Sequence, residues 1–325
     1  MAKKKGKNGL SSWSEYSVIL VDADAPRDLW LLARRQGVGA SETAKVCGIS
    51  RWGTALQVWR DKTSTEPPSD EPPSESAKWG HLHEPVIADV YAQENSLVLD
   101  HVGLLQSVKW PWMLATPDRA VAGARELVEI KTTDKEFYKD WANGQTPDDA
   151  EMQAQKQLAV TGYNAVHVVA LIGGSHMESR YITRDQELID HITEIERKFW
   201  HDHVLTKTAP PATALDTATV ADMYPQPDPN TVVELPTEAF YLISEYKEAR
   251  TEEKNAAARK DQAGNRLKQM LGHHEIGKLH GDFAVSWKAA TTSKLDQKLL
   301  RDQQPQLFDQ YVTERVERRI YLGKA

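Results

Sequence analysis

Two carboxylates and one lysine are spaced in this chain as a metal-dependent phosphodiester-cleaving centre requires. Asp118 follows a proline, and eleven residues later Glu129-Ile130-Lys131 lies in an apolar segment. Side chains alternate along a strand, so Val128 and Ile130 can face a core while Glu129 and Lys131 share the opposite face. Carboxylates hold hard divalent cations, which activate water, and an ammonium group stabilises the charge that develops during attack. The pattern predicts a nuclease centre, although a Glu-x-Lys on a strand is more often a solvated charge pair.

Three further segments surround this pattern in a fixed order. They are Arg34-Arg35-Gln36-Gly37-Val38-Gly39-Ala40-Ser41-Glu42 running into Ile49-Ser50-Arg51-Trp52-Gly53-Thr54, then Trp79-Gly80-His81-Leu82-His83-Glu84-Pro85, then Gln153-Ala154-Gln155 followed by Leu158-Ala159-Val160-Thr161-Gly162. Together the four motifs resemble the YqaJ-like viral recombinase family, the group of PD-(D/E)xK nucleases that contains the phage lambda exonuclease. The resemblance covers about residues 27 to 204. It implies an α/β, restriction-endonuclease-like core with a central mixed sheet flanked by helices.

The resemblance also implies a role for each matching residue. Asp118 and Glu129 match the family's metal carboxylates, the Ile130 carbonyl matches a further ligand, and Glu84 matches an acid near a second metal ion or its water shell. The implied cofactor is Mg²⁺, with Mn²⁺ as the alternative.

The remaining matches concern catalysis and DNA binding. Lys131 matches the catalytic lysine, and Gln153 matches the glutamine that orients the attacking water and the scissile phosphate; Gln155 is the second choice. The residues that match the family's contacts to the 5′ phosphate of a DNA end are Arg34, Ser41 and Thr116.

Two positions depart from the family pattern. Arg119 follows Asp118 where a glycine is common, and Thr133 stands where a proline often occurs. Neither change removes a ligand, but Arg119 predicts a different local turn.

The implied function is a Mg²⁺-dependent 5′→3′ exodeoxyribonuclease that leaves a 3′ single strand for phage-type homologous recombination. Expected partners are double-stranded DNA ends, a single-strand annealing protein and further copies of the chain, commonly a trimeric ring. The motif fixes the chemistry and not the polarity, so an endonuclease or another polarity on the same core stays open. A non-catalytic DNA-end-binding module is the other alternative, and the intact Asp118, Glu129 and Lys131 argue against it.

Composition limits the possible classes of protein. The 325 residues are 40% hydrophobic and include ten tryptophans, which supports a substantial core. The net charge of −7 limits non-specific DNA affinity, but an enclosed, locally basic channel remains compatible with it. Cys47 is the only cysteine, which excludes intramolecular disulfides and fits a reducing cytoplasm; the family resemblance implies that of a bacterial host. Apolar runs of about 20 residues, as a membrane span needs, do not occur in the sequence.

Composition shifts predict four parts of the chain: a disordered basic tail over residues 1–12, the exonuclease core over 13–205, a proline-rich linker over 206–236, and a C-terminal appendage over 237–325. In the core we expect helices over 13–61 and 79–95, with Pro85 near the start of the second, a helix over 148–161 and a buried strand over 165–172. The appendage should be α+β, with a long polar helix over 237–271, a strand pair turning at Gly281-Asp282, a helix near 295–304 and a final strand over 312–322.

Overall fold

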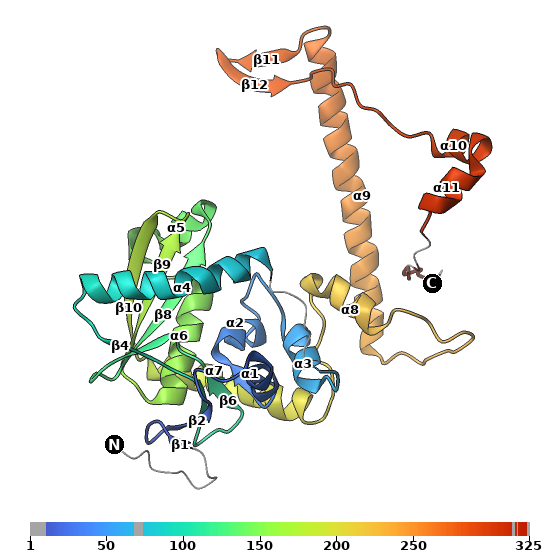
Figure 1. Ribbon diagram of the computed structural model, residues 1–325. Helices are drawn as coiled ribbons and strands as arrows, with labels where there is room; N and C mark the ends of the chain where they lie inside the picture. Colours follow the sequence, from blue (N-terminus) through green and yellow to red (C-terminus); the bar gives the residue numbers. More distant parts are fainter. Residues whose placement is uncertain (1–10, 68–73, 314–315, 317, 324–325) are drawn as a thin grey trace. The chain divides into compact units, whose positions relative to one another are not determined.

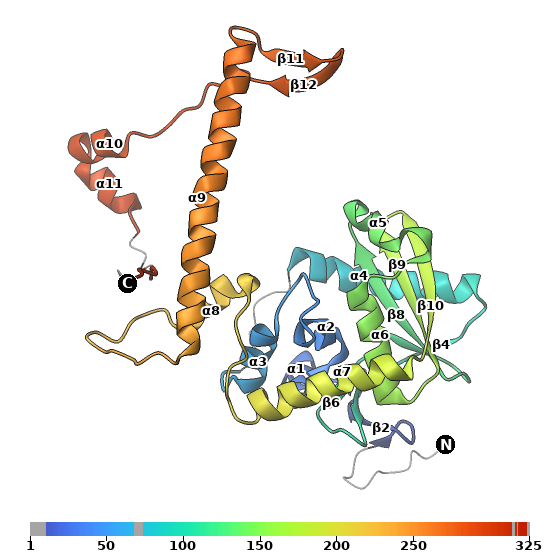
Figure 2. The same ribbon diagram turned by 180° about the vertical axis from the view of Figure 1, so that it is seen from behind.

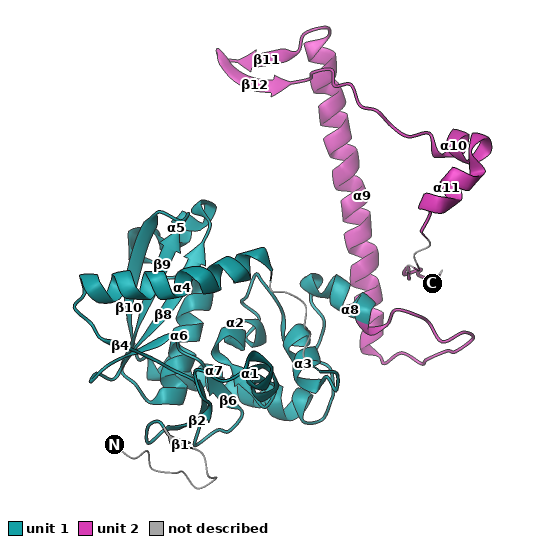
Figure 3. Ribbon diagram, viewed as in Figure 1, with its two compact units in different colours: residues 1–222 teal, residues 223–325 magenta. Residues whose placement is uncertain are grey.

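The computed structural model describes residues 11–67, 74–313, 316 and 318–323. All but the last two residues of the predicted basic tail lie outside these ranges. The chain forms two compact units, residues 1–222 and 223–325, and each is described by itself (Figure 3). The first unit therefore includes residues 206–222, which the sequence assigned to a linker.

The first unit contains two five-stranded mixed sheets (Figure 1). The first sheet has the order β1-β2-β5-β6-β3, formed by Ser11–Ser12, Ser17–Val21, Leu104–Ser107, Met113–Ala115 and Val38–Gly39. The second has the order β10-β9-β8-β7-β4, formed by His176–Thr183, Ala165–Ile172, Glu126–Thr133, Arg119–Val121 and Leu99–His101. In the described part of the chain, only β3–β6 and β8–β9 pair in parallel. The predicted α/β class, with mixed sheets flanked by helices, is confirmed.

The helices of the first unit are α1 Arg27–Arg34, α2 Thr43–Val46, α3 Ala55–Thr63, α4 Glu75–Glu94, α5 Tyr138–Trp141, α6 Asp148–Thr161, α7 Gln186–Lys198 and α8 Thr217–Met223. Short 3-10 segments lie at Ala40–Glu42, Lys135–Phe137, Ala142–Gly144 and Ala214–Asp216, and a π-helical segment, Phe199–Val204, extends α7.

Helix α6 has clear start and stop signals. Asp148 and Asp149 lie in its first turn, where the helix dipole favours negative charge. It ends at Gly162, whose φ of 68° is left-handed and suits a residue without a side chain. The predicted helix over 148–161 and the predicted strand over 165–172 are both confirmed.

The second sheet is packed between α4 and α6. On one face, Val128 and Ile130 of β8 contact a cluster that includes Ile87 and Tyr91 of α4. The other face supplies Leu127 of β8 to the largest core cluster, which also contains Ala150, Ala154 and Leu158 of α6 and Val166, Val168 and Ala170 of β9. The two views in Figures 1 and 2 show α4 and α6 on opposite sides of the strands. Alternation along β8 therefore turns Glu129 toward α6.

A buried ion pair fixes the position of α6. Lys156 of α6 pairs with Glu196 of α7, and both side chains are fully buried. Thr43 of α2 donates a hydrogen bond to the same carboxylate, with Oγ1 2.8 Å from Oε1. Burial lowers the pKa of Lys156 and raises that of Glu196, because it disfavours both charged forms. Three helices are joined by this group.

Three expectations for individual elements are wrong. Residues 17–21 form a strand instead of a helix, because the β-branched run of β2 pairs with β5. Helix α4 begins at Glu75, capped by the Ser74 side chain, so Pro85 lies well inside the helix and not near its start. The final strand expected over 312–322 is absent from the described residues there, since no neighbouring strand supplies hydrogen bonds.

The second unit contains α9 Glu238–Leu271, β11 Ile276–Leu279, β12 Asp282–Ser286, α10 Gln297–Gln303 and α11 Pro305–Tyr311. The predicted long helix is confirmed, and β11 and β12 form the expected antiparallel pair. Among the described residues, none of the helices combines the length and apolar character that crossing a membrane would require.

Candidate active site on the second sheet

Glu129 is the centre of a network of short hydrogen bonds. The residue is only 3% exposed. Oε1 accepts from Lys131 Nζ at 2.7 Å and from Gln153 Nε2 at 2.5 Å, while Oε2 accepts from Gln157 Nε2 at 2.6 Å. Lys131 Nζ also donates to Gln153 Oε1 at 2.7 Å. Strand β8 and helix α6 thus bring the predicted acid, lysine and glutamine together.

Asp118 joins the same site from the segment that precedes β7. Its Oδ2 accepts a hydrogen bond from the backbone N–H of Ile130 at 2.7 Å. Burial and the negative charges of Glu129 and Glu84 raise the pKa of Asp118 well above its usual range, despite that hydrogen bond and the positive charge of Lys131. Three carboxylates therefore repel one another here.

Arg119 connects Glu84 to this group. Its Nη1 donates to Glu84 Oε1 at 2.6 Å and to the Asp118 carbonyl oxygen at 2.6 Å. Arg119 is 5% exposed and opens strand β7. The residue that departs from the family pattern is thus a buried cation that joins the Glu84 carboxylate to the backbone of Asp118, a contact that was not predicted.

Lys131 remains a cation in this setting. Burial disfavours its charged form, but the carboxylates of Glu129 and Asp118 outweigh that effect and raise the pKa of its ammonium group. A permanent positive charge consequently lies beside the acids.

The chemistry of the donor set fits a hard divalent cation. Asp118, Glu129 and Glu84 supply carboxylate oxygens, and Ile130, whose carbonyl is the further expected ligand, donates its backbone N–H to Asp118. A cation bound among these oxygens would relieve the repulsion that raises the pKa of Asp118. In the described part of the chain no three Asp, Glu, His or Cys side chains already converge as metal ligands. Glu84 is held by Arg119, and both oxygens of Glu129 accept hydrogen bonds.

A second polar cluster contains Arg34 and Ser41. Arg34 Nη2 lies 3.2 Å from Ser41 Oγ and 2.9 Å from Glu42 Oε1. Lys62 Nζ, from α3, donates to Glu42 Oε1 at 2.9 Å and to the Arg34 carbonyl oxygen at 3.0 Å. Burial opposes ionisation of Glu42, but Arg34 and Lys62 outweigh it and lower the pKa of its carboxyl. Asp61 lies 3.4 Å from Lys62 and also pairs with Arg35, so three cations against two acids leave a net positive charge near Ser41.

Strand pairing brings Thr116 toward this cluster. Gly39 of β3 pairs in parallel with Leu114 of β6. Ser41 comes two residues after Gly39, and Thr116 comes two residues after Leu114. Because the two strands are parallel, both residues lie beyond the same edge of the sheet. Thr116 is half-buried and lies two residues before Asp118. The short segment from Thr116 to Asp118 therefore links the two clusters.

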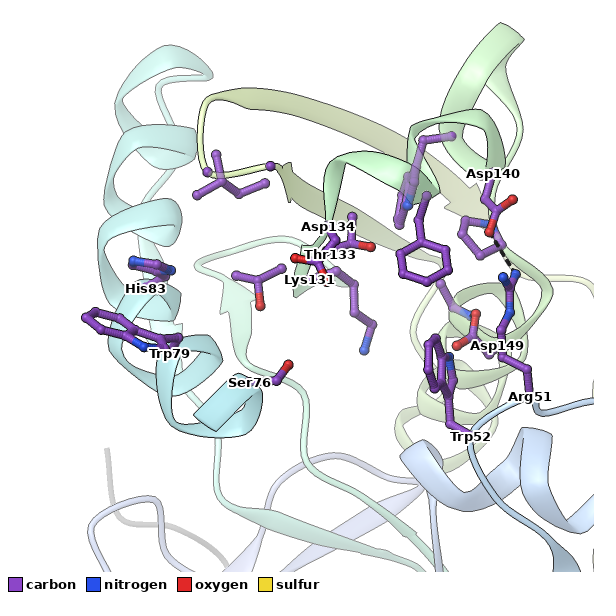
Figure 4. Close-up of a pocket in the computed structure, with 18 of the residues that line it drawn as sticks. Arg51, Trp52, Ser76, Trp79, His83, Lys131, Thr133, Asp134, Asp140 and Asp149 are labelled. Atoms are coloured by element: carbon purple, nitrogen blue, oxygen red, sulfur yellow. Dashed lines mark hydrogen bonds and ion pairs between the residues drawn. The ribbon is translucent and has the colours of Figure 1, made fainter. Parts of the chain in front are cut away.

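A cavity of about 610 Å³ opens beside Lys131. Trp79 and His83 of α4 line one side, with ring centroids 5.5 Å apart. On the other side, Trp52 meets Phe137 edge to face at 5.7 Å. Figure 4 shows the Lys131 side chain between these two walls. The catalytic candidate is thus reached through an aromatic-walled opening.

The structure separates the two glutamines that the sequence analysis compared. Gln153 lies in the site, whereas Gln155 donates to Glu151 and to the Thr183 carbonyl oxygen and accepts from the backbone of Asp185. Gln157 was missed, although it lies four residues beyond Gln153 and such spacing places side chains on one helix face. Lys62 was also missed, and no local pattern marks it.

Comparison with known proteins identifies the family. A family model for the YqaJ-like viral recombinase domain matches residues 29–164. The protein named "Uncharacterized protein YqaJ" from Bacillus subtilis (strain 168) is 30% identical over 311 residues, which are 93% of this chain and 96% of that protein. The chain therefore belongs to the YqaJ-like viral recombinase family, as its four ordered motifs predicted.

Solved exonuclease structures are also similar to the chain. An alkaline exonuclease (LHK-Exo) from Laribacter hongkongensis, in complex with dAMP, is 21% identical with a TM-score of 0.47, covering 60% of this chain and 98% of that one. A phage related exonuclease from Haemophilus somnus 129PT is 14% identical with a TM-score of 0.43, covering 53% of this chain and 96% of that one.

Proposed function

We propose that this chain is a metal-dependent exodeoxyribonuclease that digests linear duplex DNA from its 5′ ends. Family membership makes it a nuclease, and the acid–lysine–glutamine arrangement supports the proposed site. The observation that carries the proposal is the environment of Glu129, whose buried carboxylate is held by Lys131, Gln153 and Gln157 beside Asp118. A solvated charge pair, the ordinary alternative, would leave Glu129 exposed.

Mg²⁺, or Mn²⁺ in its place, would be held by Asp118, Glu129 and the Ile130 carbonyl, with Glu84 nearby. When bound, such a cation polarises a phosphoryl oxygen and lowers the pKa of a water molecule.

The side chains of the site have separate tasks in the cleavage reaction. Lys131 holds a positive charge where the phosphoryl oxygens become more negative, and its charged form is stabilised by Glu129 and Asp118. Gln153 offers an amide oxygen, now accepting from Lys131, that can accept a hydrogen bond from the attacking water. Gln157 fixes the orientation of the Glu129 carboxylate.

The cluster around Ser41 supports the 5′ polarity. Arg34 offers planar donors suited to phosphate, and Ser41 adds a hydroxyl 3.2 Å away. Glu42 holds Arg34 and Lys62 in place, and the cluster, with Arg35 and Asp61 included, keeps a net positive charge. A 5′ phosphate bound here would lie on the strand edge that leads, through Thr116, to Asp118.

The wider role follows from the family. The 3′ single strand left by the enzyme would serve phage-type recombination with a single-strand annealing protein, in the cytoplasm of a bacterial host. Several copies would enclose the DNA, as a trimeric ring by resemblance.

Strand-specific labelling tests the polarity. Linear duplex labelled at the 5′ or the 3′ end is digested with Mg²⁺, and closed circular duplex is the matched control. The 5′ label should be released early in small products while the 3′ label stays in long fragments, and the circle should survive. Early loss of the 3′ label would reverse the polarity, and cleavage of the circle would indicate an endonuclease.

A further inference from the structure

Helix α9 carries a seven-residue pattern along its whole length. Spacings that alternate between three and four residues, starting at Ala239, select Ala239, Leu242, Tyr246, Ala249, Glu253, Ala256, Lys260, Ala263, Leu267 and Met270. Eight of these ten are apolar, and the alternation is that of the a and d positions of a coiled coil. We call these ten residues the seam.

The seam is uncovered within the described part of the second unit. Leu242 is 65% exposed, Tyr246 45%, Leu267 45% and Met270 75%. The single buried residue of α9 is Leu271, which lies off the seam and close to Gly277 of β11. Figure 3 shows the hairpin of β11 and β12 at the C-terminal end of the helix. A helix of 34 residues, roughly 50 Å long, gains most of its stability from packing an apolar face.

We propose that α9 forms an antiparallel two-stranded coiled coil with α9 of a second copy of this chain. The two-fold axis passes between Lys254 and Asn255. In this register Leu242 packs against the partner's Leu267, and Tyr246 packs against the partner's Ala263. The proposal concerns the second unit and is independent of the nuclease assignment. A two-fold pair cannot form for every copy within a three-fold ring, so in such an assembly the pair would join copies from two rings.

The charges that flank the seam select this partner and orientation. The residues just before successive a positions are Glu245, Glu252, Arg259 and Arg266, acidic in the first half of α9 and basic in the second. Such positions face each other in an antiparallel pair, so Glu245 meets the partner's Arg266 and Glu252 meets the partner's Arg259. Each pair occurs twice in the dimer, and every pair is of opposite charge.

A shift of register by one heptad would lose this complementarity. One direction of shift places Glu252 against the partner's Glu252, and the other places Arg259 against the partner's Arg259. The charges therefore specify one register as well as one orientation.

The two charged seam residues exclude the parallel arrangement. In a parallel pair Glu253 would face the partner's Glu253, and Lys260 would face the partner's Lys260. In the antiparallel pair each faces an alanine, Ala256 or Ala249, and Glu253 lies one layer from the partner's Lys260. The small alanines leave room for these opposite charges to meet.

Cysteine crosslinking of the full chain tests the register. Tyr246→Cys and Ala263→Cys are made separately in a Cys47→Ala background, and the two chains are co-expressed with different tags. A disulfide needs Cα atoms within about 7 Å, and Tyr246 lies roughly 25 Å from its own counterpart in the antiparallel pair. Disulfide-linked dimers should form when both variants are present and not with either alone. Equal crosslinking of a single variant, or none in the mixture, would overturn the proposal.

Charge exchange tests the partner. Glu252→Arg and Arg259→Glu should each weaken self-association about tenfold, because two attractive pairs become repulsive. The double variant, and an equal mixture of the two single variants, should recover association. Asp261→Arg, the same acid-to-base change away from the seam flanks, is the matched control and should have little effect.

If neither the double variant nor the mixture recovers self-association, the pairing of Glu252 with the partner's Arg259 is contradicted. Circular dichroism of each variant shows whether the loss of self-association comes from unfolding of the helix. A helix that packs instead on its own first unit, or on a different protein, would show neither the crosslink nor the recovery.

Discussion

Replacing Gln157 with leucine separates the site role of this residue from a structural role. Gln157 Nε2 donates to Glu129 Oε2 at 2.6 Å, and the Gln157 side chain is fully buried. Its Oε1 has no hydrogen-bond partner among the described residues. The variant Gln157→Leu therefore loses one charge-assisted hydrogen bond and also removes one unsatisfied buried carbonyl oxygen.

The lost hydrogen bond lowers the free energy of unfolding, and removal of the unsatisfied oxygen raises it. Only the lost hydrogen bond affects the cleavage rate. Loss of a hydrogen bond to a charged group costs about 1.5–3 kcal/mol, and relief of an unsatisfied buried group returns about 1–3 kcal/mol. The free energy of unfolding should thus change by no more than about 2 kcal/mol in either direction. If the bond orients Glu129 during cleavage, the same 1.5–3 kcal/mol lowers the rate roughly 10- to 150-fold.

The assay combines kcat on linear duplex with urea unfolding. Gln155→Leu is the matched control on the same helix: it loses three hydrogen bonds, two of them to backbone groups, and leaves Glu129 untouched. We expect a stability loss of roughly 2–4 kcal/mol for the control, with kcat of the folded protein within about threefold of wild type. A Gln157→Leu enzyme with wild-type kcat would refute the role given to Gln157.

Three further predictions concern other parts of the first unit. Wild type should degrade 5′-phosphorylated duplex faster than 5′-hydroxyl duplex, and Arg34→Ala should erase most of that preference; equal initial rates on the two ends for wild type would remove the 5′-phosphate assignment. The lowered pKa of Glu42 means that its ionised form stabilises the fold above the unfolded-state pKa, and that this contribution is lost as pH falls through the folded-state pKa. Glu42→Gln should therefore cost more stability at pH 7 than at pH 3 in denaturant titrations, and a pH-independent cost would argue against the ion pairs. Lys156→Met should cost about 3–5 kcal/mol by leaving Glu196 buried without its cation, and adding Glu196→Leu should recover part of that loss in urea unfolding.

Much of the fold could be predicted because local signals agreed with tertiary packing. Helix α6 has acidic residues at its start and Gly162 at its end, and β9 is a continuous apolar run between two packed faces. Strand β2 could not be separated from a helix by its apolar run alone, since its pairing with β5 joins residues far apart in the sequence.

The contrast between local signals and long-range contacts also explains which site residues could be predicted. Glu129 and Lys131 could be placed together because strand alternation is a local rule, and Gln157 could have been found from its spacing to Gln153. Arg119 and Lys62 could not, because their partners, Glu84 and Glu42, are distant in sequence and meet them only in the folded chain.

The central claim is that Lys131 serves phosphodiester cleavage, and its removal tests this most directly. Lys131→Ala should abolish digestion of linear duplex in Mg²⁺ while leaving folding and DNA binding largely intact, because its charge stabilises the transition state. Lys198→Ala, a change at an exposed lysine on α7, is the control and should keep full activity. Near wild-type digestion by purified Lys131→Ala would contradict the account.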